Sequence, residues 1–297
     1  MKQILLLILV LWNPVLIAQE EQDSVPPEGW RSQGSIRLLF SQSAFNDEWT
    51  GGGTSSLAGN LNLDYSLNYK RGSFTWDNKF LATYGLTKLK NDEFTRKTSD
   101  RLELNSIAGK QLQSTNWYYS FFGNFRTQLG PGFEYSTDPD TGREIRSKTT
   151  DFFSPAYLQS GPGFMWKKND DLWFNMAPAT ARLIFVDRSF TSGSEYVNGS
   201  YYGVEKGESS RFEFGASFSG FARLNLFQNV TLENSLSLYS DYLTEPGNVD
   251  IDYLADLNMA VNDFLSANLI FQAIYDDNIV GAFQIREVFG AGLTYAF

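Results

Sequence analysis

The 297-residue sequence contains no cysteine and no histidine, which excludes disulfides, thiolate metal sites and any catalytic or metal site that needs an imidazole. Its formal net charge of −10 argues against nucleic acid as a partner, because phosphate binding requires a basic surface. Mean hydropathy is only −0.29 although aromatic residues make up 16% of the chain. Strands that alternate apolar and polar side chains produce this combination.

The N-terminal region predicts export. Residues 1–18 combine Lys2 with an apolar run over residues 4–11 and small residues before a polar stretch, which is typical of a cleaved signal peptide. Residues 19–32 are polar and proline-rich and predict a flexible periplasmic tail. Residues 33–297 are left for the folded domain.

Alternation with a period of two residues recurs along the rest of the chain and predicts about twelve strands. These are expected at residues 34–40, 57–69, 74–86, 101–108, 117–128, on both sides of 167–171, and at 211–226, 230–238, 249–259, 265–275 and 289–297. The two strands around 167–171 have the weakest pattern. Pro162 and Pro178 lie in them, and because proline cannot donate a ladder hydrogen bond, we expect bulges there.

The connections alternate in length. Short turns are expected near residues 70–72, 113–116, 168–171, 227–229 and 261–264. Long polar loops are expected near 43–56, 87–99, 130–153 and 187–210, and shorter polar ones near 243–248 and 277–282. Tight periplasmic turns and larger extracellular loops are the rule for outer-membrane barrels. A soluble β-sandwich would share the alternation but not this pattern of connections.

The chain ends on an amphipathic strand that finishes with Phe297, which resembles the C-terminal signal read by the outer-membrane assembly machinery. The predicted fold class is therefore all-β, an antiparallel transmembrane barrel of about twelve strands, located in the outer membrane of a Gram-negative cell. Its expected partners are outer-membrane lipid and the assembly machinery.

Polar residues on the expected inner faces predict a charged lumen. The predicted lumen-lining residues are Arg37, Asp64, Arg101, Glu103, Asn124, Arg126, Gln128, Arg182, Glu213, Arg223, Asp250, Asp252, Asp256 and Arg286. Two interpretations stay open: a pore lining that selects solutes by charge, or Arg–carboxylate pairs that fill a narrow barrel and close it. Asp250, Asp252 and Asp256 share one face of their strand, which is typical of lumen lining rather than of a catalytic acid–base pair.

Aromatic residues near the short turns predict a girdle at the lipid boundary. They are Trp76, Trp117, Trp166, Trp173, Tyr295 and Phe297. No segment has the residues of a complete metal or phosphate motif; residues 138–142 lack the third acidic position and the distal glutamate of a calcium loop and predict a plain turn. We therefore expect no cofactor, no metal and no enzymatic activity.

Several segments resemble the Bacteroidota secreted family catalogued as domain of unknown function 3078 (DUF3078). They are Trp49 with Gly51-Gly52, Trp76-Asp77-Asn78, residues 96–102, Thr127-Gln128, residues 154–157, Ala177-Pro178, residues 275–277 and residues 284–290. The resemblance implies a Gram-negative envelope protein and no assigned activity, so it supplies no catalytic residue.

The leading functional expectation is a narrow channel or uptake pore for small solutes. The alternative is a structural or partner-binding barrel with a sealed lumen that displays extracellular loops 130–153 and 187–210. A histidine-free enzyme is a third possibility.

Overall fold

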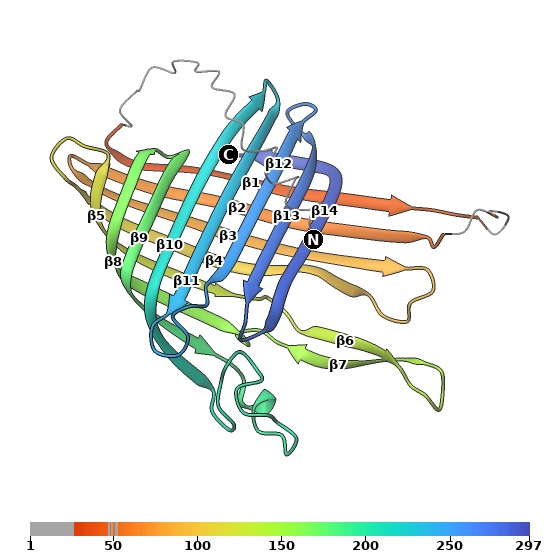
Figure 1. Ribbon diagram of the computed structural model, residues 1–297. Coiled ribbons are helices and arrows are strands. Elements are labelled where there is room, and N and C mark those ends of the chain that lie inside the picture. Colours follow the sequence, from red (N-terminus) through yellow and green to blue (C-terminus); the bar gives the residue numbers. More distant parts are fainter. Residues whose placement is uncertain (1–26, 47, 49, 51–52) are drawn as a thin grey trace.

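A computed structural model describes residues 27–46, 48, 50 and 53–297. The predicted signal peptide and most of the predicted tail lie outside these residues. Twelve antiparallel strands close into one barrel (Figure 1), which confirms the predicted fold class. The barrel strands are β1 (Gly29–Ser43), β2 (Ser56–Arg71), β3 (Phe74–Leu89), β4 (Arg96–Gln111), β5 (Trp117–Thr127), β8 (Ala156–Asn169), β9 (Leu172–Phe185), β10 (Ser210–Phe227), β11 (Val230–Asp241), β12 (Asp250–Ala260), β13 (Leu265–Asp276) and β14 (Val280–Ala296).

The alternation of side chains sets the two faces of the barrel wall. On β5, Trp117, Tyr119 and Phe121 point outward, and Phe121 is 57% exposed, whereas the side chain of Ser120 on the inner face is 8% exposed. So large an apolar outer surface would be costly in water and suits hydrocarbon. None of the helices among the described residues is long and apolar enough to cross a membrane.

The connections place all short turns at one end of the barrel, here called the turn end, and the long loops at the other, the loop end. β3 and β4 are longer than predicted, so the connection between them covers only residues 90–95. The loop predicted over residues 130–153 contains a hairpin of β6 (Gly132–Thr137) and β7 (Glu144–Thr150), which extends beyond the barrel (Figure 1). The loop after β9 carries a short 3-10 helix, Arg188–Phe190.

The strand register is irregular near Pro162 and Pro178, the two prolines at which bulges were expected. The β9–β10 register moves from Thr180↔Gly215 to Ala177↔Ser217, so β9 holds one extra residue where Pro178 lies. Pro162 lies on β8, within the stretch where the β8–β9 register is also interrupted, and it pairs with Phe121 of β5. The bulge expected at Pro178 is confirmed. The bulge expected at Pro162 is wrong, because between Ser160↔Ala181 and Phe164↔Met176 the extra residue lies on β9 and not on β8.

Trp173 is the one predicted girdle residue that points inward. It packs against a buried cluster inside the barrel, formed by Ile107, Tyr118, Phe122, Met165 and Ala177. The reason is local: Trp173 and Phe174 are consecutive aromatics, and Phe174 takes the outer face, where Trp166 stacks on it and Trp117 meets it edge to face. Trp76, Tyr295 and Phe297 are exposed on the outer surface as well.

The barrel closes where β1 meets β14. Six residue pairs join the strands, from Ser35↔Ala296 to Phe40↔Ala291. Gly34 and Phe297 extend the ladder by two backbone hydrogen bonds of 2.8 and 2.9 Å. A Cβ on Gly34 would lie 2.7 Å from the Phe297 ring, so a larger residue there would force the ring to move.

Candidate functional site: the charged lumen

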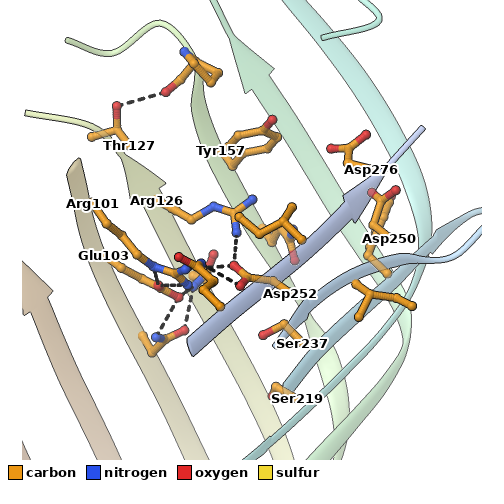
Figure 2. A pocket seen from close by; sticks show the side chains of 18 of the residues that line it. Arg101, Glu103, Arg126, Thr127, Tyr157, Ser219, Ser237, Asp250, Asp252 and Asp276 are labelled. Carbon is orange, nitrogen blue, oxygen red and sulfur yellow. Dashed lines mark hydrogen bonds and ion pairs between the residues drawn. The ribbon is translucent and has the colours of Figure 1, made fainter. Parts of the chain in front are cut away.

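A network of ion pairs and hydrogen bonds crosses the lumen from β4 and β5 to β12. The carboxylate of Asp252 accepts hydrogen bonds from Arg101 Nη1 at 2.9 Å and from Arg126 Nη1 at 2.6 Å (Figure 2). Gln272 Nε2 donates to the other oxygen of Asp252 at 2.9 Å, and Arg286 Nη2 donates to Gln272 Oε1 at 3.0 Å. We call these five residues the cross-lumen network. Because they come from five strands, they tie opposite walls together.

Glu103 extends the network along β4 and β5. It pairs with Arg101, whose Nε donates to Glu103 Oε2 at 2.6 Å. Asn105 and Asn124 both donate to Glu103 Oε1, at 3.0 and 2.8 Å. Every oxygen of this buried carboxylate therefore has a partner, as burial of a charge requires.

A second cluster surrounds Arg182. Its guanidinium pairs with Asp250 and lies 3.4 Å from Glu213 and 3.6 Å from Asp276. It also lies over the Tyr239 ring, 4.4 Å from the centroid, in a cation–π arrangement. Asp250, Asp276 and Asp277 place carboxylate oxygens within 4.8 Å of one another, and Arg182 supplies the positive charge facing the first two.

A third group of ion pairs lines the side of the lumen nearer the turn end. Arg37 pairs with Asp256 at 2.6 Å. Lys79 bridges Asp64 at 3.0 Å and Glu233 at 3.7 Å. Arg223 lies 2.9 Å from Glu233 and reaches Asp171 in the β8–β9 turn at 2.6 Å. Opposite charges thus alternate across the narrow interior.

Two cavities remain inside the barrel. The larger has a volume of about 450 Å³ and reaches loop residues Thr150 and Tyr202. The smaller, of about 60 Å³, lies beside Arg37, Asp64 and Glu233. Four residues line both cavities and so separate them: Thr83, Arg101, Gln272 and Arg286. Three of these four, Arg101, Gln272 and Arg286, belong to the cross-lumen network, so the network supplies most of the partition between the cavities.

The apolar cluster around Phe122 and Trp173 closes the other side of the large cavity, which both residues line. Beneath that cluster, Lys167 Nζ pairs with Asp77 at 2.6 Å and with Asp170 at 2.8 Å. Side chains of these two layers thus lie between the large cavity and the β8–β9 turn.

All the predicted lumen residues face inward. Nine line the large cavity: Arg101, Glu103, Asn124, Arg126, Gln128, Arg182, Asp250, Asp252 and Arg286. Arg37, Asp64 and Asp256 line the small one. Glu213 and Arg223 join the ion pairs described above. Sequence reasoning missed Gln272 and Asp276, which lie on the inner face of β13 and could have been found from its alternation.

The long loops are held by side chains rather than left loose. The carboxylate of Glu144, the first residue of β7 beside the turn of the hairpin, accepts hydrogen bonds from the backbone N–H groups of Glu93 and Phe94, at 3.0 and 3.3 Å, and pairs with Arg96 at 2.5 Å. Arg146 lies between two aromatic rings, 4.6 Å from Phe94 and 4.2 Å from Phe133. The β6–β7 hairpin is thereby docked on the β3–β4 connection.

Tyrosines anchor the loop after β9 over the large cavity. Tyr201 Oη donates to the Thr149 carbonyl at 2.9 Å, and burial raises the Tyr201 pKa to about 12. Tyr202, its neighbour, packs with Tyr157, Ile184 and the loop residue Val204, and lines the cavity. This loop therefore forms part of the cavity wall.

Residues 40–133 match the family model described as protein of unknown function (DUF3078). The match includes the segment around Trp76 and residues 96–102, two of the segments on which the resemblance was based; those from residue 154 onward lie outside it. The Bacteroidota origin stays a prediction. No curated protein matches the chain.

Among solved structures, the chain is similar to the β domain of the Bordetella autotransporter BrkA at 12% identity, with 90% of this chain and 98% of that chain covered and a TM-score of 0.31. It is similar to the COG4313 outer membrane channel from Pseudomonas putida F1 at 12% identity, with 94% and 98% covered and a TM-score of 0.37. The translocator domain of autotransporter NalP from Neisseria meningitidis is also 12% identical, with 92% and 90% covered and a TM-score of 0.35. The assignment of the barrel fold rests on the strand pairing of this chain itself.

Proposed function

We propose that the protein is a narrow outer-membrane channel, an uptake pore for small solutes, that the cross-lumen network keeps closed at rest. The observation that carries the proposal is the partition between the two cavities. It consists of side chains, not backbone, so rotation of a few χ angles would join the cavities without unfolding any strand.

The charges of the network suit a gate. Asp252 holds two guanidinium groups, and a solute carboxylate or ammonium group that reached the network could replace one partner of such a pair. Exchange of one ion pair for another costs less than leaving a charge unpaired in a buried site. The bilayer supplies the apolar surroundings of the outer wall and the lumen supplies the polar path.

Planar-bilayer recording tests the proposal. Wild-type protein should show small, brief openings, and Arg126→Ala, which removes one member of the cross-lumen network, should increase the conductance. The control is Lys148→Ala, which removes an exposed ion pair with Asp151 on the loop side, far from the partition. If neither wild type nor Arg126→Ala carries current while both remain folded in the membrane, the channel proposal fails.

The docked β6–β7 hairpin favours one alternative, a sealed barrel that displays its loops to a partner. The ion pair between Glu144 and Arg96 fixes the hairpin relative to the barrel, and a rigid projection loses less entropy on binding than a mobile one. This alternative predicts zero current for every lumen variant. It also predicts that deleting residues 132–150 abolishes partner binding while assembly continues.

A further inference from the structure

The β14 strand is paired with β1 over only part of its length. The β1–β14 ladder ends at Phe40↔Ala291, whereas β14 begins at Val280 and pairs with β13 as far as Val280↔Asp276. Within residues 27–46, 48, 50 and 53–297, the stretch 280–290 therefore has a strand neighbour on one side only. In Figure 1, β1 runs to the right and β14 downward from the segment where they pair.

Backbone groups on this edge need hydrogen-bond partners. The N–H and C=O of Phe297 face β1, and an antiparallel strand presents every second residue to the same neighbour. The same groups of Phe289, Glu287 and Ile285 therefore face the open side. Each would cost several kcal/mol in hydrocarbon, and unpaired backbone at membrane depth is tolerated where it lines a water-filled space.

The side chains of the edge also indicate water. The residues from Val280 to Ile285 are all exposed, on both faces of the strand, whereas β13 beside them alternates between buried and less buried positions. Glu287 is exposed on the outer face and forms no ion pair among the described residues. A carboxylate in contact with lipid tails is unfavourable, so this part of the wall borders an aqueous gap.

The large cavity extends to the same edge. Gln284 and Arg286 of β14 line it, together with Tyr275 near the end of β13 and Ile279, the last residue before β14. Arg286 donates to Gln272 but, within the part of the chain that the structure describes, has no carboxylate partner. On the outer face of the strand, Phe283, Ile285 and Phe289 are 56%, 62% and 60% exposed. A cation inside and an apolar strip outside thus meet at one open edge.

We propose that the gap between β1 and residues 280–290 of β14 is a lateral opening for a single-tailed amphiphile with an anionic head. The head enters the large cavity and pairs with Arg286, and the tail lies along Phe283 and Ile285 toward the lipid. This inference rests on the proposed channel, because it names the class of solute that reaches the gate from the membrane side.

Cysteine cross-linking tests the opening itself, and the natural chain has no cysteine to interfere. Leu38→Cys with Leu293→Cys, a pair within the ladder, should form a disulfide under mild oxidation because paired strands bring Cα atoms to roughly 5.5 Å. Gln42 and Phe289 would form the next pair beyond Phe40↔Ala291 if the ladder continued. Gln42→Cys with Phe289→Cys should therefore remain unlinked. Equal cross-linking of both pairs would mean that the strands are paired throughout and would overturn the proposal.

Binding tests the ligand class. Calorimetry with protein in lipid nanodiscs would use dodecanoate, dodecyl phosphate and dodecyltrimethylammonium as probes. Both anionic probes should bind, and Arg286→Gln should weaken them at least about 10-fold, the loss expected for one charge-assisted hydrogen bond. If only one of the two anionic probes binds, its head group, carboxylate or phosphate, is the head group that the site recognises. Binding of the cationic probe alone, or no effect of Arg286→Gln on a correctly folded barrel, would refute the proposal.

The tests of channel and opening are separable. Current without Arg286-dependent binding would refute the lateral opening and leave the channel proposal standing. Arg286-dependent binding without current would refute the channel proposal and leave the lateral opening standing. A strand from a second copy could also cover this edge. If the single variant Glu287→Cys forms disulfide-linked dimers under oxidation, a second copy covers this edge, and the lateral opening is overturned.

Discussion

Asp252→Asn should destabilise the barrel far more than an equivalent change at its rim. Asp252 is 8% exposed and accepts hydrogen bonds from three side chains: Arg101, Arg126 and Gln272. The substitution keeps the shape but leaves Arg126 without its carboxylate partner and Arg101 with Glu103 alone. Breaking a buried ion pair by removing one partner costs about 3–5 kcal/mol, and because Arg126 borders the large cavity we expect the lower end, about 3 kcal/mol.

The control is Asp171→Asn. Asp171 is 46% exposed and pairs with Arg223 at the turn end. Exposed pairs contribute at most about 1 kcal/mol, so this variant should unfold close to wild type. Tryptophan fluorescence during urea unfolding in detergent micelles or lipid vesicles would give the free energies of unfolding. Equal losses for the two variants would refute the claim that the cross-lumen network is a buried, mutually dependent layer.

Three further predictions concern the wall and the loops. Deleting residues 295–297 removes two of the six β1–β14 pairs and the contact with Gly34, so the variant should be absent from outer-membrane fractions on immunoblots; normal levels would contradict the closing role of β14. Phe121→Arg should prevent assembly, because a charge on the lipid face costs about 2–4 kcal/mol near mid-membrane, while Phe121→Leu should assemble. Tyr201→Phe should remove a tyrosinate titration near pH 12. The folded state raises the Tyr201 pKa above its usual value of about 10. The stabilisation by Tyr201 is therefore complete below pH 10 and is lost as the pH rises through 12. A Tyr201 titration at the ordinary value would show that the loop does not bury it.

The inside and outside of the wall could be predicted because side-chain alternation is a local property of a strand. Phe121 outward and Arg126 inward follow from a period of two residues alone. Trp173 was placed on the wrong face because two adjacent aromatics leave the phase ambiguous. The proline bulge on β9 was predictable for the same local reason that proline lacks an N–H.

The pairing across the lumen could not be predicted. Arg101 and Asp252 are 151 positions apart in sequence, and their meeting depends on the tilt and stagger of twelve strands, which no local pattern encodes. The β6–β7 hairpin was missed because its strands are only six and seven residues long and β7 is almost wholly polar. The short β1–β14 ladder depends on how the barrel closes and has no signal in either strand.

The reversal potential of Asp252→Asn across a planar bilayer with a salt gradient tests the central claim most directly. If the cross-lumen network closes the path, removal of its shared anion should open it and leave Arg101 and Arg126 facing the solute. The variant should then conduct more than wild type and select anions. A variant that is folded and inserted but conducts no more than wild type, or that prefers cations, would contradict the claim.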